Sequence, residues 1–354
     1  MKSSAASGAS GNPGGGLSVR QLVFGSTLKH TFQPDGKGAG KSESLSKPDD
    51  LTSLGGRLFA AFQNGVDSQG ETAPSGNNDS TVVEFTPAGK VVRQWDVTGK
   101  VDGLGTDAGS GQVIATVNED GNSSLYAISP ASASATHYTY SEKLPHLGGT
   151  DSVTSYGGRL LISASAPGTS GKQPASAPAV YAVTLKGTTA RVSPYFADNA
   201  TATVVNGPKA GKTTLALTDP DSSGVVPSGS SSYAGDFVLD SQADQELIFT
   251  SGSAAKLSVL KVKQAVDDSA WVTSARGTLY ASDPGSDTID AITGLKPGSV
   301  YSAETPCDAA NAPTACPGPG FPANSLVQLN LKTGALSSVA GTTAVNPQGL
   351  TFVP

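Results

Sequence analysis

The chain has 354 residues, of which 37% are hydrophobic and 15% charged, with 43 glycines and 23 prolines. This length and composition predict a large, turn-rich β protein with a weakly charged surface. The formal net charge of −6 and the lack of a Lys/Arg cluster argue against a nucleic-acid partner, and no apolar stretch reaches the roughly 18 residues of a transmembrane segment.

The N-terminal residues 1–16 are almost entirely Ser, Ala and Gly. They cannot bury a core and are expected to be a disordered linker, whereas residues 17–354 are expected to form one domain. Lys2 is not followed by an apolar core, so the sequence shows no signal peptide. Because such linkers often follow a removed signal or a lipid-bearing cysteine, we expect a mature secreted or surface-tethered protein. A cytosolic protein is the alternative.

The domain opens with a phrase that returns after 102 residues. Asp49–Leu58 (DDLTSLGGRL) matches Asp151–Leu160 (DSVTSYGGRL) without a gap, and a looser copy begins at Asp102. Repeats of about 50 residues, each holding several short strands, are typical of a β-propeller with four-stranded blades. The sequence therefore predicts an all-β propeller.

The blade starts are predicted at residues 49, 102, 151, about 201, 236, 268 and 348. Residues 201–205 and 214–217 are expected to be inner strands of the fourth blade. The runs 236–240 and 246–249 either begin a fifth blade or complete the fourth. Residues 270–274 and 277–281 are expected to be the first two strands of the next blade. This count gives seven blades, or six if the starts at 201 and 236 merge.

Both ends of the domain are expected to share one blade. Residues 346–353 resemble a first strand with nothing after it, whereas residues 17–32 resemble outer strands without an inner partner. A blade built from both would close the ring and remove two exposed sheet edges.

The two cysteines, Cys307 and Cys316, flank a short loop rich in Pro, Ala and Asn. No further metal ligands cluster there, so the spacing predicts a disulfide rather than a metal site. A disulfide indicates an oxidising compartment, and hence an extracellular or cell-surface location.

Polar residues are predicted to surround one mouth of the central channel. In a meander, the first strand begins and the second strand ends at the same end of the blade. The residues at these positions are Asp49, Asn64, Asp102, Asn118, Glu119, Asp151, Asp219, Asp221, Asp236, Asp268, Asp283 and Gln348.

Crowded carboxylates repel one another, so some of their pKa values should be raised unless a cation is bound. Carboxylate and amide oxygens suit Ca²⁺, and the candidate ligands are Asp102, Asn118, Glu119 and Asp151. Alternatively, these side chains cap turns and need no metal. His146, in the loop entering the third blade, is the candidate general acid or base.

Several phrases resemble a family of secreted actinobacterial propeller proteins of unknown function, among them Gln94–Asp96 (QWD), Thr218–Asp221 (TDPD) and Pro347–Leu350 (PQGL). More distantly, the architecture is similar to gluconolactonase, arylesterase and strictosidine-synthase-like propellers. That resemblance implies six blades and, in many members, Ca²⁺ held in the channel by Asp, Asn and Glu.

Three functions are compatible with these features. The preferred one is a monomeric binding module that takes a small molecule or a peptide at the channel mouth. The second is a Ca²⁺-dependent, lactonase- or esterase-like hydrolase of a small extracellular substrate, in which the metal polarises a carbonyl. The third is a structural surface protein. The sequence contains no nucleophile elbow, HExxH motif or phosphate-binding loop.

Overall fold

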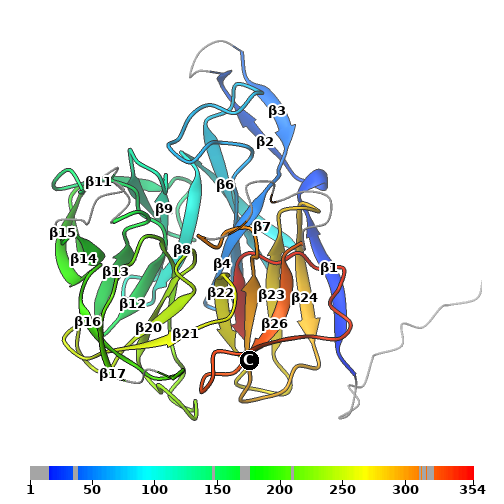
Figure 1. The fold of residues 1–354 in the computed structure, drawn as a ribbon. Coiled ribbons are helices and arrows are strands. Elements are labelled where there is room, and N and C mark those ends of the chain that lie inside the picture. The colour runs from blue at the N-terminus through cyan, green and yellow to red at the C-terminus, as the bar shows by residue number, and fades with distance from the viewer. Residues whose placement is uncertain are drawn as a thin grey trace, which may run out of the picture.

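The computed structural model describes residues 16–34, 39–145, 148–167, 176–208, 211–310, 312, 316 and 323–354. Within these residues the chain forms strands and one short 3₁₀ helix, η1 (Gly25–Thr27), and no α-helix (Figure 1). No helix in this part of the chain is long and apolar enough to cross a membrane. Most of the expected linker, residues 1–15, lies outside the described residues.

The strands are described here as four-stranded antiparallel units, numbered from one to six and given from the innermost strand outward. Units two and three are joined into one eight-stranded sheet, because β11 pairs in parallel with β15. Unit one contains β4 (Pro48–Leu54), β5 (Arg57–Phe62), β6 (Asp79–Phe85) and β7 (Val91–Thr98). Unit two contains β8 (Val101–Asp107), β9 (Gln112–Val117), β10 (Ser124–Ile128) and β11 (Thr136–Tyr140). Unit three contains β12 (Val153–Tyr156), β13 (Arg159–Ser163), β14 (Pro178–Lys186) and β15 (Thr189–Ala197).

The second half of the chain supplies the remaining units. Unit four contains β18 (Pro220–Val225), β19 (Phe237–Ser241), β20 (Glu246–Thr250) and β21 (Leu257–Lys261). Unit five contains β22 (Val266–Trp271), β25 (Val300–Glu304), β26 (Ser325–Leu329) and β27 (Leu336–Ser338). Unit six contains β28 (Leu350–Val353), β23 (Thr278–Asp283), β24 (Thr288–Thr293) and β1 (Ser18–Phe24).

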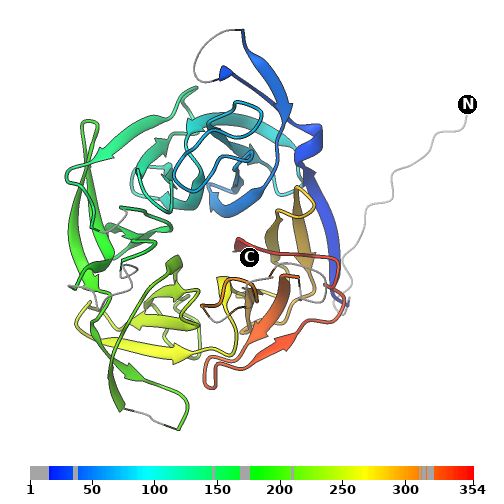
Figure 2. The same cartoon turned by 45° about the horizontal axis from the view of Figure 1, so that its top comes forward.

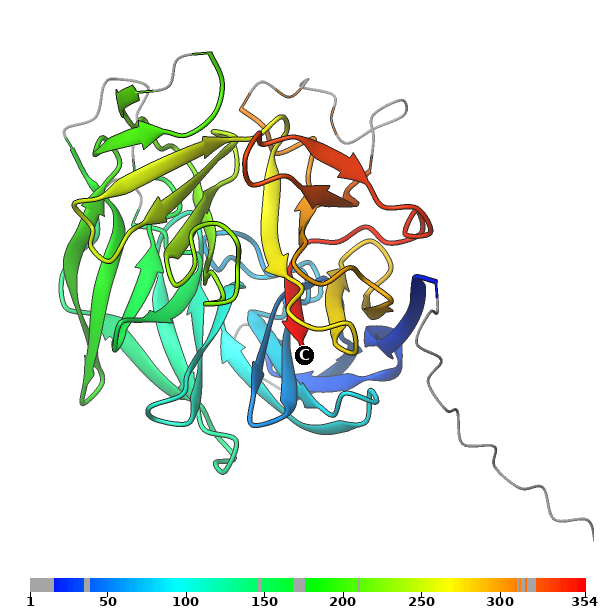
Figure 3. The ribbon, with the colours of Figure 1, turned by 90° about the horizontal axis from the view of Figure 1, so that it is seen from below.

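The units are arranged around a common centre, with the C-terminus near the middle and β1 on the rim (Figures 2 and 3). This arrangement confirms the predicted β-propeller fold. The hydrophobic core is divided into clusters that lie between neighbouring units. For example, Phe59 and Trp95 of unit one pack with Val113 and Ile128 of unit two. Burial of apolar side chains between sheets is the main force that holds adjacent units together.

The strands expected at residues 201–205 and 214–217 are not inner strands. β16 (Thr201–Val204) and β17 (Gly211–Thr214) form a hairpin that extends unit four at its outer edge, where β16 pairs in parallel with β21. The innermost strand of that unit is β18, which starts beside Asp221. The start predicted at residue 236 instead precedes β19, the second strand.

The pairing expected between residues 270–274 and 277–281 is also wrong. β22 pairs with β25, whereas β23 pairs with β24 and with β28 in unit six. The chain therefore visits unit six for one hairpin before it returns to complete unit five. Sequence proximity favours pairing of successive strands, so this interleaving could not be read from the repeat.

Strands from both ends of the domain meet in unit six. β28 is its innermost strand and β1 its outermost one. β2 (Lys29–Phe32), which the sequence also places among the outer strands, instead forms a separate hairpin with β3 (Lys41–Ser44). Cys307 and Cys316 form the predicted disulfide, with 5.3 Å between their Cα atoms.

Candidate functional site

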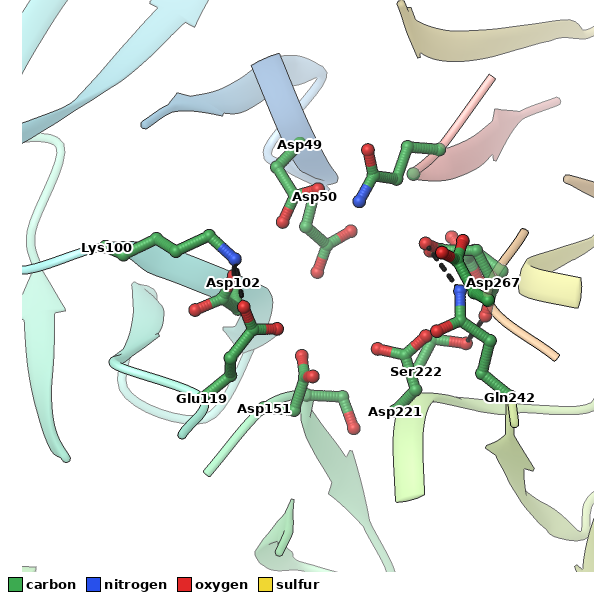
Figure 4. A pocket seen from close by; sticks show the side chains of 15 residues that line it. Asp49, Asp50, Lys100, Asp102, Glu119, Asp151, Asp221, Ser222, Gln242 and Asp267 are labelled. Carbon is green, nitrogen blue, oxygen red and sulfur yellow. Dashed lines mark hydrogen bonds and ion pairs between the residues drawn. The ribbon is translucent and has the colours of Figure 1, made fainter. Parts of the chain in front are cut away.

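A strongly acidic cavity of about 230 Å³ lies where the innermost strands begin (Figure 4). Nine carboxylate side chains and one lysine line it, together with a few neutral polar residues. The lining residues are Asp49, Asp50, Lys100, Asp102, Glu119, Asp151, Ser152, Asp221, Ser222, Gln242, Asp267, Asp268, Asp308, Gln348 and Gly349.

An irregularity shared by the innermost strands places these side chains. In unit one, Pro48 faces Phe62 and Leu51 faces Ala60, so Asp49 and Asp50 together face the single residue between them. The same two-against-one arrangement, a β-bulge, occurs at Asp267–Asp268 in unit five. A regular strand sends successive side chains to opposite faces, whereas a bulge re-aims them. Both residues of each bulge therefore reach the same cavity.

The second carboxylate of each such pair ties neighbouring units together. Asp50 accepts a hydrogen bond from the backbone N–H of Leu51 in its own strand and another from that of Leu104 in unit two, both at 2.6 Å. Asp268 accepts equivalent bonds from Ser269 at 2.6 Å and from Leu350 of unit six at 2.7 Å. These two side chains are thus held against the channel wall.

The receiving strand carries glycine at the matching position. A Cβ atom on Gly103 would lie 2.3 Å from the carbonyl oxygen of Asp151 and 2.5 Å from Oγ1 of Thr116. A Cβ atom on Gly349 would lie 2.5 Å from the carbonyl oxygen of Asp49. Only glycine permits this close approach of adjacent strands.

Lys100 is the single basic residue in the described part of the cavity lining. Its ammonium contacts Asp102 Oδ1 at 2.7 Å and also pairs with Glu119. Burial alone would lower the pKa of Lys100, but the neighbouring carboxylates outweigh burial and raise it. Burial raises the pKa of Asp102 to about 7 even though Lys100 opposes the shift. The cavity thus already holds one primary ammonium between two carboxylates.

Several other carboxylates of the described lining form no direct ion pair. The side chain of Asp49 points into the cavity, is 8% exposed and has no hydrogen-bond partner (Figure 4). Burial, followed by repulsion from Asp102, raises its pKa well above the ordinary value. Buried Oδ2 atoms of Asp102 and Asp221 also lack partners. Uncompensated buried charge is costly, so these groups either hold protons or require a cation.

Asp151 and Asp221 line the same cavity, and burial raises the pKa of both carboxyl groups. Neighbouring carboxylates raise these pKa values further, led by Asp102 at Asp151 and by Asp267 at Asp221. The protonated form of both side chains is therefore favoured unless a cation is bound nearby.

Asp240 occupies a related position outside the cavity lining. It faces the bulge at Asp221–Ser222, is 3% exposed, and neither carboxyl oxygen has a partner. Thr116 faces the bulge of unit two, and Ser163 follows Ile162 at the corresponding place in unit three. The hydroxyls of Thr116 and Ser163 donate to the carbonyls of Asp151 and Asp221. Burial raises the pKa of Asp240 well above its usual value, and the neighbouring carboxylates raise it further.

The structure brings seven of the predicted mouth residues into the cavity lining: Asp49, Asp102, Glu119, Asp151, Asp221, Asp268 and Gln348. Asp221 arrives there for a reason other than the expected one. The sequence suggests that it ends a second strand, but it lies near the start of β18, the innermost strand of unit four.

Three predicted residues instead hold the backbone together. Asn64 accepts a bond from Ser46 N and donates to Asp79 O and to Thr81 Oγ1. Asn118, a proposed Ca²⁺ ligand, accepts from Lys100 N and donates to Asn122 O. Asp283 accepts from the backbone N–H groups of Ser286 and Asn346. These side chains are the turn caps that the alternative interpretation expected.

Two further predicted residues, Asp219 and Asp236, lie away from the cavity lining. Asp219 accepts a bond from Ala243 N and is absent from the cavity lining. Asp236 precedes β19, whose first residue, Phe237, faces the far end of β18, so Asp236 lies at the opposite end of unit four from Asp221. His146 lies outside the described residues.

Sequence reasoning missed Asp50, Lys100, Asp267 and Asp308 in the lining. The repeated pair Asp49–Asp50 and Asp267–Asp268 was the available signal, but strict strand alternation favoured one residue of each pair. Asp308 follows Cys307 directly, so the disulfide anchors the loop that carries it. Lys100 lies two residues before Asp102, and no repeated sequence feature indicates that it would line the cavity.

The donor set is not arranged as a metal centre. Within the described part of the chain, no three His, Cys, Asp or Glu side chains are placed to hold one metal ion. The carboxylates surround the cavity rather than converge on a point. The predicted Ca²⁺ set of Asp102, Asn118, Glu119 and Asp151 includes one side chain, Asn118, that is occupied by backbone contacts.

Neither a protein-family model nor a curated protein matches the chain in sequence. Among solved structures, a chain of a nidogen/laminin complex aligns over 96% of this chain and 99% of its own length, with a TM-score of 0.51 and 8% identity. A virginiamycin B lyase from Staphylococcus aureus aligns over 93% and 76%, with a TM-score of 0.44 and 10% identity. The similarity to the nidogen/laminin chain bears on the fold alone.

Proposed function

We propose that the units are the blades of a closed six-bladed propeller whose sixth blade is shared by the two ends of the domain. The cores support this count, because each cluster joins two neighbouring units and one joins unit six to unit one through Tyr280, Ile289, Leu51 and Phe62. β28 also lies beside β4 as well as β22. Six blades is the alternative count that the sequence allows if the blade starts predicted at residues 201 and 236 merge.

We propose that the protein is a binding module for a small organic cation, taken at the acidic mouth of the channel. The observation that carries the proposal is the unpartnered side chain of Asp49, nine-tenths buried and aimed into a cavity with nine carboxylates and one lysine. A cation would replace the protons that these groups otherwise hold, and it would be attracted by their combined field.

The lining favours a hydrogen-bonding ammonium over other cations. Lys100 shows that two of these carboxylates accept a primary ammonium. No aromatic side chain lines the cavity among the residues that the structure describes, although recognition of quaternary ammonium groups uses aromatic cages. The carboxylates also do not converge as the ligands of a single Ca²⁺ ion would.

A Ca²⁺-dependent hydrolase is the second candidate. The acidic lining suits a hard cation in charge, and a bound ion could draw the carboxylates together. Its support is the charge alone, since three carboxylates do not converge among the described residues. An extracellular location fits either function, because the disulfide is favoured by an oxidising compartment.

Calorimetric titration with methylammonium at pH 8 tests the proposal. We expect saturable binding to the wild type, binding at least tenfold weaker to Asp49→Asn, and unchanged binding to Glu142→Gln, which removes one exposed charge elsewhere. Affinity should fall from pH 8 to pH 5, because protons then compete for carboxylates such as Asp102, whose pKa is about 7. Binding of Ca²⁺ but not of methylammonium would favour the second candidate.

A further inference from the structure

A second cavity of about 480 Å³ adjoins the acidic one along the channel. Four residues line both cavities and therefore form the boundary between them: Asp50, Ser152, Ser222 and Asp268. Two of these are small serines. The other two are the carboxylates that backbone N–H groups of adjacent strands hold against the wall. The boundary thus consists of small or wall-bound side chains.

The second cavity differs in chemistry from the first. Its walls are the innermost strands beyond the bulges, which present aliphatic and aromatic side chains alternating with hydroxyls. The apolar part of the lining comprises Leu51, Leu104, Val153, Trp271, Leu350 and Phe352. Among the described residues, no charged side chain lines it beyond the boundary residues Asp50 and Asp268. Away from that boundary this cavity suits an apolar stem and offers no carboxylate to a second cation.

We propose that the ligand is a primary ammonium on an unbranched apolar chain, with its head among the carboxylates and its stem in the second cavity. This inference rests on the proposed function and specifies the class of the organic cation. The acidic cavity, at about 230 Å³, is below the roughly 300–1,000 Å³ of drug-sized pockets and suits a head group only. The adjoining 480 Å³ falls within that range.

The acidic cavity is charged and the second cavity is largely apolar, and this difference would make the site selective for one class of ligand. A primary ammonium can donate to three acceptors, which matches a wall of carboxylates that includes the unpartnered Asp49. Binding would remove the apolar surface of the stem, and that of residues such as Leu104 and Leu350, from contact with water. A diamine of the same length would place its second charge among these apolar groups and lose affinity.

Titration of the wild type with n-alkylammonium chlorides from methyl to hexyl at pH 8 tests this inference. We expect affinity to rise roughly fourfold for each methylene that enters the second cavity, and 1,6-diaminohexane to bind more weakly than hexylammonium. Equal affinity for methylammonium and hexylammonium would overturn the inference and leave the proposed function standing. Failure of every ammonium to bind would reject the proposed function as well.

A plugged variant locates the stem. Thr106 lines the second cavity and not the first, so Thr106→Phe should fill the stem site and leave the carboxylates in place. We expect it to remove the chain-length dependence while methylammonium still binds. Ser110→Phe, in the exposed turn after the same strand, is the matched control. Thr52→Phe fills the second cavity from another strand and replaces Thr106→Phe if that variant does not fold. If a folded variant of either kind still bound longer alkylammonium ions more tightly, as the wild type does, the proposal would be contradicted.

Discussion

Replacement of Lys100 by Met removes the only cation of the acidic cavity lining and should destabilise the protein in a pH-dependent manner. Lys100 is 16% exposed and Asp102 is 4% exposed, so screening by solvent is weak at this pair. In the wild type the pKa of Asp102 is about 7. Without Lys100 its pKa rises further, because the group that opposes the effect of burial is gone.

The magnitude follows from the protons bound by each state. Asp in the unfolded chain has a pKa of about 3.9, so above that value the folded variant holds a proton at Asp102 that the unfolded chain lacks. Its stability therefore falls by about 1.4 kcal/mol for each pH unit. The stability of the wild type falls in the same way only up to about pH 7, the pKa of Asp102 in the presence of Lys100. At pH 6 the variant should thus be less stable than the wild type by about 1 kcal/mol, chiefly because the partly exposed pair with Glu119 is lost. At pH 8.5 the difference should be about 3 kcal/mol, because only the variant continues to lose stability above about pH 7.

Urea unfolding of both proteins at the two pH values measures this difference. Lys90→Met, in an exposed turn, is the control and should change the free energy of unfolding by less than about 0.5 kcal/mol at either pH. A Lys100→Met penalty that is the same at pH 6 and pH 8.5 would show that Lys100 does not neutralise a buried carboxylate. The electrostatic description of the cavity would then be wrong.

Three further substitutions test the framework around the site. Asp240→Ser should raise the free energy of unfolding by about 1–3 kcal/mol at pH 8, because it removes a buried carboxyl without partners whose protonated form folding favours. The gain should be smaller near pH 3, where the carboxyl is protonated in both states, and destabilisation at pH 8 would contradict this. Gly103→Ala should lower the free energy of unfolding in urea by about 1–3 kcal/mol, because its Cβ would strike the Asp151 carbonyl. The control Gly224→Ala, with 3.9 Å of clearance, should lower it by less than about 1 kcal/mol, and equal losses would refute the close approach. Replacement of Cys307 and Cys316 by Ser should lower stability by about 2–3 kcal/mol through loop entropy, and an unchanged melting temperature would argue against that contribution.

The sequence predicts the fold well where the repeat is strict. Asp49, Asp102 and Asp151 occupy the same position in successive copies, and all three reach the acidic cavity. The terminal strand around Leu350 is likewise predicted from its lack of a following partner, and it pairs with β23. Local patterns of turns and apolar runs suffice for these features because the strands concerned are neighbours in the chain.

Several features could not be predicted from the local pattern of the sequence. The pairing of β22 with β25 skips an entire hairpin that belongs to another unit. The bulges that bring Asp50 and Asp267 into the cavity break the period-two alternation on which strand reasoning depends. The division of carboxylates into cavity lining and turn caps follows from backbone partners, as the contrast between Glu119 and Asn118 shows.

The central claim is that the carboxylates at the channel mouth bind an organic ammonium. A crystal structure of the protein grown with n-butylammonium at pH 8 tests it most directly. We predict that the ligand nitrogen lies within about 2.7–3.2 Å of a carboxylate oxygen of Asp49 and of at least one further cavity carboxylate, with the butyl chain directed past Ser152 toward Leu104. A structure in which the acidic cavity holds no ammonium other than that of Lys100, at a ligand concentration that saturates any binding seen in solution, would contradict the claim.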